Sequence, residues 1–544
     1  MFRSVEQENF YSRLKAHFDA PDKPLLLEGA TGLGKTRAYL AAIAHAVNKG
    51  KKIALVLPTH MLIEQLLNSS DIQAVLPSNI TIRSFLPKRR FDIDSEYREH
   101  KAKAIDADIM LCTSASVIID QRLRGEYNGA INRDFIVFDE ADQLPEAAAL
   151  QSDCEITSSE LSELNIKSNI AKQVATEVLT KKNISSEIRA SALLILEAIE
   201  EPAWYHSAGQ TSDGGIMLFH KMPGRLLKRI SNQPNVAFIS ATLSIGGTFD
   251  DFKRSMGIVT ESQLSTIIEP KKHGSLTFHV SDKSVEDHDW ISEIVATVDS
   301  AIKPCLVVTP SHHLATTLGE LIGDSVVRSK EETTSEAAKR LGTHSILIAA
   351  GAWAGLDTPI QWKSIVVPRI PYERPVVLDD QVESSFLHTR NTAIRRMRQV
   401  IGRGLRTPDA VCDIYINDKR FKNVESFIPQ RFRNEWKNKS FLEGSRAEVT
   451  ISKLERDPSI RKTALRHYGK LCMACGFVPK VDSQLDVHHL FPLAEGGERY
   501  TAITDVAVLC ANCHRLAHTA TPPHSVDRLK VLLGSAQEIV EKLD

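Results

Sequence analysis

The stretch Gly29-Ala-Thr-Gly-Leu-Gly-Lys35-Thr36 decides the fold of this chain. An apolar run over residues 24–27 precedes it, and an alanine-rich helical pattern over residues 38–47 follows it. A strand, a glycine loop and a helix in this order are typical of a phosphate-binding loop, in which backbone N–H groups at a helix N-terminus surround phosphate. A glycine-rich turn that matches by chance is the alternative, and both flanking patterns argue against it.

Each residue type in this loop has a chemical reason. Gly29, Gly32 and Gly34 would let the backbone close around the β- and γ-phosphates. Lys35 would reach the terminal phosphates, and the Thr36 hydroxyl would bind Mg²⁺. We therefore expect the chain to bind a nucleoside triphosphate.

The composition is that of an ordinary globular protein. The 544 residues are enough for three or four domains, and 42% are hydrophobic and 25% charged. The net charge of −1 gives no argument for a nucleic-acid partner. Residues 388–440 hold thirteen Lys and Arg against five Asp and Glu, a run that charge alone would explain as a solvated face. No signal peptide is visible and no apolar run approaches the about 18 residues of a membrane span, so we expect a cytoplasmic protein.

Further apolar runs alternate with helical patterns and predict a parallel α/β sheet. The run at residues 135–138 leads directly into Asp139 and Glu140, as a buried parallel strand does when it delivers carboxylates to its C-terminal edge. Asp139 would hold Mg²⁺ through water, and Glu140 would orient the attacking water. Residues 143–233 lack strong strand signals and predict a polar, mostly helical insertion. A second series of apolar runs, from residue 304 to residue 417, predicts a second α/β unit.

Taken together, these blocks resemble the superfamily 2 helicases. The shared motifs are the phosphate loop, Asp139-Glu-Ala-Asp142, Ser240-Ala-Thr242 and Gln399-x-x-Gly-Arg403-x-x-Arg406. Asp-Glu-Ala-Asp alone would suggest a DEAD-box RNA helicase. Those proteins usually carry Pro-Thr-Arg-Glu-Leu and His-Arg-x-Gly-Arg, whereas this chain has Pro58-Thr-His-Met-Leu and Gln399. The blocks Trp353-x-Gly355-x-Asp357 and Arg369-Ile-Pro-Tyr372 are similar to the DinG/XPD branch, and the resemblance covers roughly residues 1–440.

The resemblance implies two RecA-like parallel-sheet motor domains with ATP between them. It assigns Gln7 to the adenine, and it assigns hydrolysis of Mg²⁺-ATP to Lys35, Thr36, Asp139 and Glu140. From the second domain it places Gln399 and Arg403 at the γ-phosphate, Asp357 in the nucleotide site, and Arg406 as an arginine finger. Because the second domain supplies cations, closure and hydrolysis would be coupled.

The resemblance also implies DNA as the tracked strand. Ser240 and Thr242 would link the nucleotide to single-stranded DNA, along which this branch generally moves 5′ to 3′. Many members hold an iron–sulfur cluster with four cysteines between the phosphate loop and the acidic block. This chain has only Cys112 there, so we expect no iron–sulfur cluster.

The other cysteines that matter form two Cys-x-x-Cys pairs near the C-terminal end. Cys472, Cys475, Cys510 and Cys513 have the spacing of a structural Zn²⁺ site, in which the metal staples a module too small for a large core. In a reducing compartment this pairing indicates metal rather than disulfides. An ordinary zinc ribbon used only for binding remains open on the cysteines alone.

Histidines between and after these pairs indicate a second metal. His514 and His518 are at i and i+4 and share one helix face, whereas His488 and His489 are neighbours on a probable strand and point opposite ways. The pattern resembles the HNH (ββα-metal) nucleases over about residues 472–518. The resemblance implies that His489 is the general base and that His488, His514 and His518 hold a catalytic Mg²⁺, Mn²⁺ or Zn²⁺ ion. Asp505 stands where the family has its central Asn.

The sequence therefore predicts an α/β protein with a metal-stapled appendage. We expect a RecA-like domain over residues 1–245 with an insertion at about 143–233, and a second RecA-like domain over 246–440. A linker over 441–470, the HNH domain over 471–525 and a C-terminal helix over 526–544 follow.

The leading hypothesis is an ATP-dependent 5′-to-3′ DNA helicase that presents single-stranded or duplex DNA to its own HNH endonuclease. The combination is similar to the DinG-like helicases of type IV CRISPR systems, which implies antiviral defence with a multiprotein complex guided by CRISPR RNA. A stand-alone helicase-nuclease of defence or repair is one alternative. A helicase whose zinc module only binds DNA is another. We expect no membrane partner.

Overall fold

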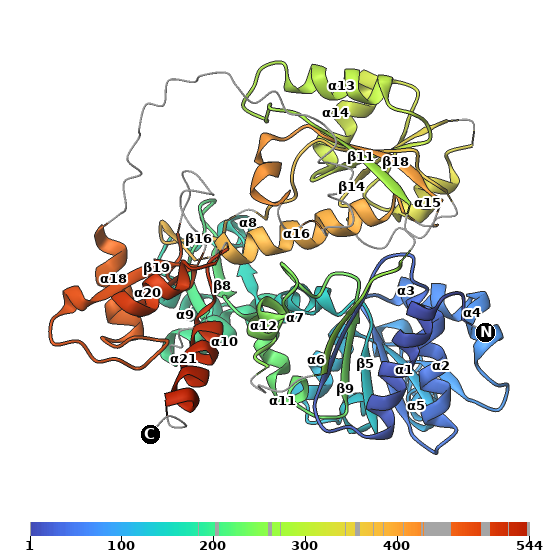
Figure 1. The fold of residues 1–544 in the computed structure, drawn as a ribbon, viewed down its shortest axis with the longest axis horizontal. Helices are drawn as coiled ribbons and strands as arrows, with labels where there is room; N and C mark the ends of the chain where they lie inside the picture. The colour runs from blue at the N-terminus through green and yellow to red at the C-terminus, as the bar shows by residue number, and fades with distance from the viewer. Residues whose placement is uncertain are drawn as a thin grey trace. The chain divides into compact units, whose positions relative to one another are not determined.

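A seven-stranded parallel sheet carries the phosphate-binding loop in the computed structural model (Figure 1). Its strand order is β10-β1-β9-β5-β2-β4-β3. The strands are β1 Leu25–Gly29, β2 Ile53–Leu57, β3 Ile82–Ser84, β4 Ile109–Thr113, β5 Phe135–Phe138, β9 Val236–Ser240 and β10 Leu264–Ile268. The structure describes residues 2–182, 184–201, 206–258, 264–271, 274–342, 344–353, 360–373, 375–383, 386–405, 407, 409–425, 428, 458–490, 501–520 and 522–540.

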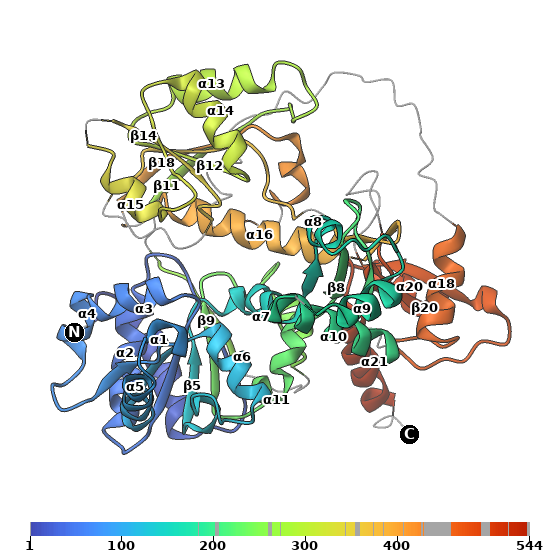
Figure 2. The same cartoon turned by 180° about the vertical axis from the view of Figure 1, so that it is seen from behind.

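Helices cover both faces of this sheet, which explains the uninterrupted apolar runs in the sequence. Leu25 and Leu27 of β1 belong to the core that the sheet shares with α1 (Val5–Asp19) and α2 (Lys35–Val47). Leu26 faces the opposite core, which the sheet shares with α6 (Ser114–Arg122) and α7 (Leu144–Ser152). Figure 2 shows the sheet from behind. The predicted parallel α/β sheet is confirmed.

A six-stranded parallel sheet forms the second motor domain, as predicted. Its order is β11-β18-β15-β12-β14-β13. The strands are β11 Ser275–Val280, β12 Cys305–Thr309, β13 Val326–Val327, β14 Ile346–Ala350, β15 Ser364–Val367 and β18 Val411–Ile416. Helices α13 (Trp290–Ser300) and α14 (His312–Ile322) pack on it. The 17-residue helix α16 (Phe386–Gly402) carries four arginines, which we call the arginine-rich motif: Arg390, Arg395, Arg396 and Arg398.

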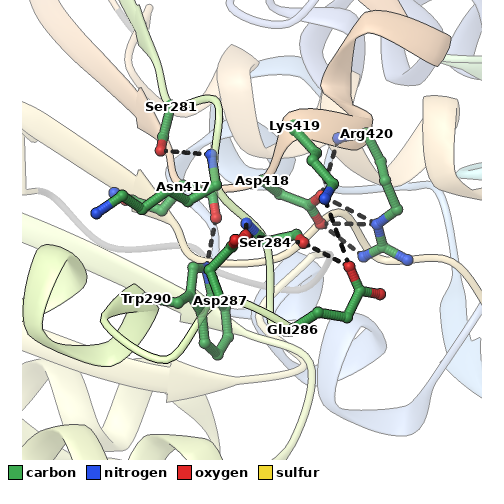
Figure 3. Close-up of polar contacts among 10 residues, drawn as sticks. Ser281, Ser284, Glu286, Asp287, Trp290, Asn417, Asp418, Lys419 and Arg420 are labelled. Carbon is green, nitrogen blue, oxygen red and sulfur yellow. Dashed lines mark hydrogen bonds and ion pairs between the residues drawn. The ribbon is translucent and has the colours of Figure 1, made fainter.

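Polar contacts fasten the ends of β11 and β18, the edge pair of this sheet (Figure 3). The Asp418 carboxylate is buried and accepts hydrogen bonds from the Ile370 backbone N–H at 2.8 Å and from Arg420 Nε at 2.9 Å. The Trp290 indole N–H donates to the Asn417 carbonyl at 2.6 Å. Asp418 therefore connects the segment after β18 to the segment after β15.

The chain forms two compact units. Residues 1–154, 222–371 and 393–440 form the first and contain both parallel sheets. Residues 155–221, 372–392 and 441–544 form the second. None of the described helices is long and apolar enough to cross a membrane.

The insertion predicted at residues 143–233 contains helices and also three strands that the sequence did not indicate. The helices are α8 (Ser158–Glu163), α9 (Ala171–Thr180) and α10 (Ser186–Glu200). The strands β6 (Cys154–Ile156), β7 (His206–Gln210) and β8 (Ile216–His220) form a small sheet in the order β6-β8-β7. Strand β7, with the sequence His-Ser-Ala-Gly-Gln, has no apolar run to reveal it.

A separate two-stranded hairpin from the second motor segment lies beside this sheet and forms one antiparallel bridge to it, between Leu378 and Thr211. Its strands are β16 (Val377–Leu378) and β17 (Gln381–Val382). Asp379, in the turn, accepts a hydrogen bond from the Gln210 backbone N–H at 2.9 Å, and Glu383 pairs with Lys221 at 2.8 Å.

The C-terminal module is an antiparallel strand pair with a following helix. Its elements are β19 (Leu485–His489), β20 (Val506–Cys510) and α20 (Ala511–Ala517), followed by α21 (Val526–Val540). A further helix, α18 (Pro458–Tyr468), lies within the range predicted as a linker and packs through Ala464 on the same core.

We predict that Asp418→Asn destabilises the second motor domain by about 2 kcal/mol, because a neutral amide weakens hydrogen bonds to a buried charged acceptor. Glu286→Gln is the control, since Glu286 is an exposed partner of Ser284 and Lys419 in the same cluster (Figure 3). Thermal unfolding, with hydrogen exchange of the Ile370 and Asn417 amides, measures both variants. Equal effects of the two substitutions would contradict the account.

Candidate active sites for nucleotide and for metal-dependent cleavage

The phosphate-binding loop has the backbone that its glycines require. Gly32 and Gly34 adopt φ values of 81° and 78°, which favour glycine, and Gly34 directly precedes α2. A Cβ atom at Gly29 would lie 2.7 Å from the Phe10 ring, so this position also admits no side chain. Lys35 and Thr36 begin α2, where the backbone N–H groups have no partner within the helix.

Gln7 braces this loop from helix α1. Its side chain is fully buried; Nε2 donates to the Gly34 carbonyl at 2.8 Å, and Oε1 accepts from the Arg3 backbone N–H at 2.7 Å. A Cβ atom at Gly34 would lie only 2.5 Å from Gln7 Nε2. The Gln7 amide thus fixes the conformation of the loop, a role that the sequence did not suggest.

One cavity of about 470 Å³ collects most of the predicted nucleotide-binding residues. From the first motor domain its lining includes Gly32, Lys35, Thr36, Asp139 and Glu140. From the second motor domain its lining includes Trp353, Gln399 and Arg403. Arg403 donates to the Trp353 carbonyl at 2.9 Å. Asp357 and Arg406 lie outside the described residues.

The acids after β5 lie in this cavity with altered acidity. Tyr39 donates its hydroxyl to Asp139 Oδ2 at 3.0 Å, and burial raises the pKa of Asp139 above its ordinary value. Burial, helped by the neighbouring acids Asp139 and Asp142, raises the pKa of Glu140 from 4.5 to about 7. Glu140 has a φ of 46°, a left-handed conformation that is uncommon for a residue other than glycine and recurs at functional sites.

Asp142 connects three motifs, a role that its position in the Asp-Glu-Ala-Asp block did not predict. Its carboxylate accepts hydrogen bonds from the hydroxyls of Ser240 and Thr242, the latter at 2.7 Å, and from Gln399 Nε2 at 2.9 Å. The Ser240 Oγ atom also lies 3.2 Å from Glu140 Oε2. The acidic block, the Ser-Ala-Thr block and the arginine-rich helix therefore meet at one buried carboxylate.

A buried ion pair joins the same helix to the strand before the phosphate loop. Arg398 and Glu28 lie 2.6 Å apart, with side chains only 9% and 4% exposed. Glu28 also accepts from the Ser244 backbone N–H, and Arg398 donates to the Ser244 carbonyl. A single charged residue buried at this depth would be costly, so each requires the other.

The second site begins with the four cysteines. Their Sγ atoms lie within 4.8 Å of one another, and the sulfurs of Cys475 and Cys510 are 3.8 Å apart. Four thiolates at about 2.3 Å from a tetrahedral Zn²⁺ would lie about 3.8 Å apart. The four cysteines therefore fit a structural zinc ion.

Three histidines converge beside this cluster. The ring nitrogens of His488, His514 and His518 lie within 4.8 Å of one another. His488 is 1% exposed, and neither of its ring nitrogens has a hydrogen-bond partner among the described residues. Burial, and then the neighbouring His514 and His518, lower the pKa of His488 to about 4, which keeps the ring neutral as a metal ligand must be. A buried imidazole whose ring nitrogens have no hydrogen-bond partner among the described residues fits a metal ligand.

The strand places the fourth histidine apart from these three. His488 and His489 are successive residues of β19, so their side chains leave opposite faces of the strand. Asp486, two residues before His488 and therefore on its face, places its Oδ2 at 3.2 Å from His514 Nδ1, where the carboxylate can accept a ring N–H. A carboxylate in this position orients a metal-binding imidazole. The alternation of the strand could have revealed Asp486 in the sequence.

Family models match three segments of the chain, and most residues of both sites lie within these segments. The family model "Type III restriction enzyme, res subunit" matches residues 3–173, "Helicase C-terminal domain" matches 294–439, and "HNH endonuclease" matches 472–520. A search of curated protein sequences finds no significant match.

Solved helicase structures share the fold. A structure named "XPD_Helicase" has a TM-score of 0.58 and 14% identity, covering 80% of this chain and 98% of that chain. Another, "XPD_APO", has a TM-score of 0.54 and 16% identity, covering 79% of this chain and 98% of that chain.

Two sheets, a shared nucleotide cavity and a metal-binding C-terminal module thus define an ATP-dependent helicase with a nuclease domain. More particularly, residues 294–439 match a helicase C-terminal domain and residues 472–520 match an HNH endonuclease, and the fold of the chain is similar to that of the XPD helicase structures.

The raised pKa of Glu140 predicts how stability depends on pH. Between pH 4.5 and about 7 the folded protein holds a proton at Glu140 that the unfolded chain has lost. The stability that this proton contributes is complete below pH 4.5 and disappears as the pH rises to about 7. We expect the thermal midpoint of the wild type, relative to Glu140→Gln, to fall through this window and to level off above it. Parallel curves for the two proteins would show that Glu140 titrates normally.

Proposed function

We propose that this protein moves 5′ to 3′ along single-stranded DNA at the expense of ATP and cuts DNA at its HNH site. The convergence of His488, His514 and His518 beside a four-cysteine cluster carries the proposal, because a module that only binds DNA needs no second metal site. The nucleotide cavity, lined by both motor domains, supplies the motor.

In the motor, Lys35 and Arg403 would neutralise the phosphates from opposite motor domains. Thr36 and Asp139 would hold Mg²⁺, and Glu140 would orient the attacking water. Gln399 would sense the nucleotide through its hydrogen bond to Asp142, and Arg406 would serve as the arginine finger. Gln7 would position the adenine edge together with the loop, and Asp357 would contribute to the same site.

In the nuclease, His489 would accept the proton of the attacking water. His488, His514 and His518 would hold a divalent ion, which when bound stabilises the negative charge on the phosphate. Cys472, Cys475, Cys510 and Cys513 would hold Zn²⁺ as a structural staple. One such site cuts one strand at a time, so the expected product is a nick.

The proposed cellular role is defence against invading DNA. An RNA-guided complex of the type IV CRISPR kind would bring the protein to invading DNA in the cytoplasm, with base pairing supplying the sequence specificity. A stand-alone nuclease of defence or repair is the alternative, and purified protein that nicks DNA without any guide RNA would favour it.

We also propose that the motor works without an iron–sulfur cluster, because Cys112 is completely buried in β4, where burial raises the pKa of its thiol to about 12. Visible iron–sulfur absorption after anaerobic purification would contradict this.

We predict that His489→Ala lowers DNA nicking at least about a hundredfold, the usual contribution of a general base, and leaves ATP hydrolysis unchanged. His467→Ala, at an exposed histidine of α18 in the same region, is the matched control and should nick normally. Gel assays on nicked plasmid measure both. Full cleavage by the His489 variant would mean that the base lies elsewhere.

We further predict that Lys35→Ala abolishes ATP hydrolysis and unwinding while metal-dependent nicking of an accessible single strand persists. Lys35 lines the nucleotide cavity, whereas Lys49 forms an exposed ion pair with Asp19 near the end of the same helix. Lys49→Ala should therefore hydrolyse ATP at the wild-type rate. An unchanged ATPase rate in Lys35→Ala would contradict the assignment of the nucleotide site to the loop that contains Lys35.

A further inference from the structure

Asp505 fastens the nuclease to the helix that carries the arginine-rich motif. It lies directly before β20 and is 3% exposed. Its Oδ2 accepts the Phe386 backbone N–H at 2.9 Å, and its Oδ1 accepts the Leu387 backbone N–H at 3.1 Å. Oδ2 also accepts the Ala502 backbone N–H at 2.9 Å.

Phe386 and Leu387 are the first two residues of α16. Backbone N–H groups in the first turn of a helix have no acceptor within the helix, and a carboxylate there also gains from the helix dipole. A carboxylate from the nuclease domain thus caps a helix that the motor domain continues, although the two residues are 119 positions apart in the chain.

This arrangement explains why the chain has Asp where HNH nucleases have Asn. Both carboxylate oxygens of Asp505 accept backbone N–H groups. An asparagine has only one acceptor oxygen, so its NH₂ group would face an N–H donor. The contact to α16 therefore requires an acid.

The same residue is also bonded to the segment that follows the proposed general base. The Asp505 carbonyl accepts the Leu490 backbone N–H at 2.8 Å, and His489 pairs with Val506 across the two strands. A shift of Asp505 would therefore move the backbone on both sides of His489.

The later residues of α16 contact the nucleotide site. Gln399 donates to Asp142, and Arg398 pairs with Glu28 before the phosphate loop. Gln399 itself lines the nucleotide cavity. The first residues of α16 are therefore bonded to Asp505 of the nuclease, and Gln399, near the other end of the same helix, lines the nucleotide cavity.

We propose that Asp505 is a positioning residue through which the nucleotide state of the motor is transmitted to the nuclease strand β19. Binding of nucleotide changes the contacts of Gln399 and Arg398, α16 shifts with them, and Asp505 carries the shift to His489. The nucleotide state of the motor then determines the position of His489 in the nuclease.

Hydrogen exchange of the full-length protein tests this without relying on cleavage. We expect Asp505→Asn to raise the exchange of the Phe386 and Leu387 amides about tenfold, as expected for the loss of a helix cap. Asp482→Asn, at an exposed acid of the same module paired with Lys470, should leave these amides unchanged. Unchanged exchange in Asp505→Asn would overturn the cap.

The coupling is tested by adding Mg²⁺ and a non-hydrolysable ATP analogue. In the wild type, we expect the analogue to change exchange over residues 485–490 at least about twofold, and in Asp505→Asn we expect no change there. A nucleotide response at 485–490 that persists in the variant, or that is missing in the wild type, would overturn the proposal.

A second variant covers the case in which Asp505→Asn loses zinc or fails to fold. Phe386→Pro removes the N–H donor at a position where helices tolerate proline, and it leaves the nuclease sequence intact. Phe386→Ala keeps the donor and is its control. Loss of the nucleotide response in Phe386→Pro but not in Phe386→Ala supports the proposal, and equal responses in both contradict it.

Discussion

The motor depends on one buried carboxylate that three segments share. Asp142 accepts hydrogen bonds from Ser240, Thr242 and Gln399, which come from both motor domains. A buried acceptor without its donors is costly, so a change at any of these residues disturbs the others. Asp142 joins Gln399 of the second domain to the acidic block, and the Arg398–Glu28 pair joins the same helix to the strand before the glycine loop.

The nuclease depends on a different constraint, because its two strands and short helix are too small for a large apolar core. The four cysteines provide a closed site that zinc can staple, and β19 then places His488 and His489 on opposite faces. The strand geometry separates the metal ligands from the proposed base. Within its own compact unit, Asp505 of this module also caps the start of α16.

Much of this could be predicted from the sequence, because strong motifs carry their own geometry. The strand, loop and helix around Lys35 follow from local spacing, as does the gathering of Cys472, Cys475, Cys510 and Cys513. The roles of Asp142, Glu28 and Asp505 could not be predicted, because their partners are about 100, 370 and 119 positions away in the chain. Strand β7 could not be predicted because its five residues, His-Ser-Ala-Gly-Gln, contain no large apolar side chain.

The central claim is that one polypeptide uses ATP to bring DNA to its own nuclease. The most direct measurement maps the nicks on a duplex that carries one single-stranded gap, with Mg²⁺ present and with or without ATP. The account predicts that nicks spread from the gap into the duplex in one direction when ATP is present. Without ATP, it predicts that the nicks stay within the gap. An identical distribution of nicks under both conditions would contradict it.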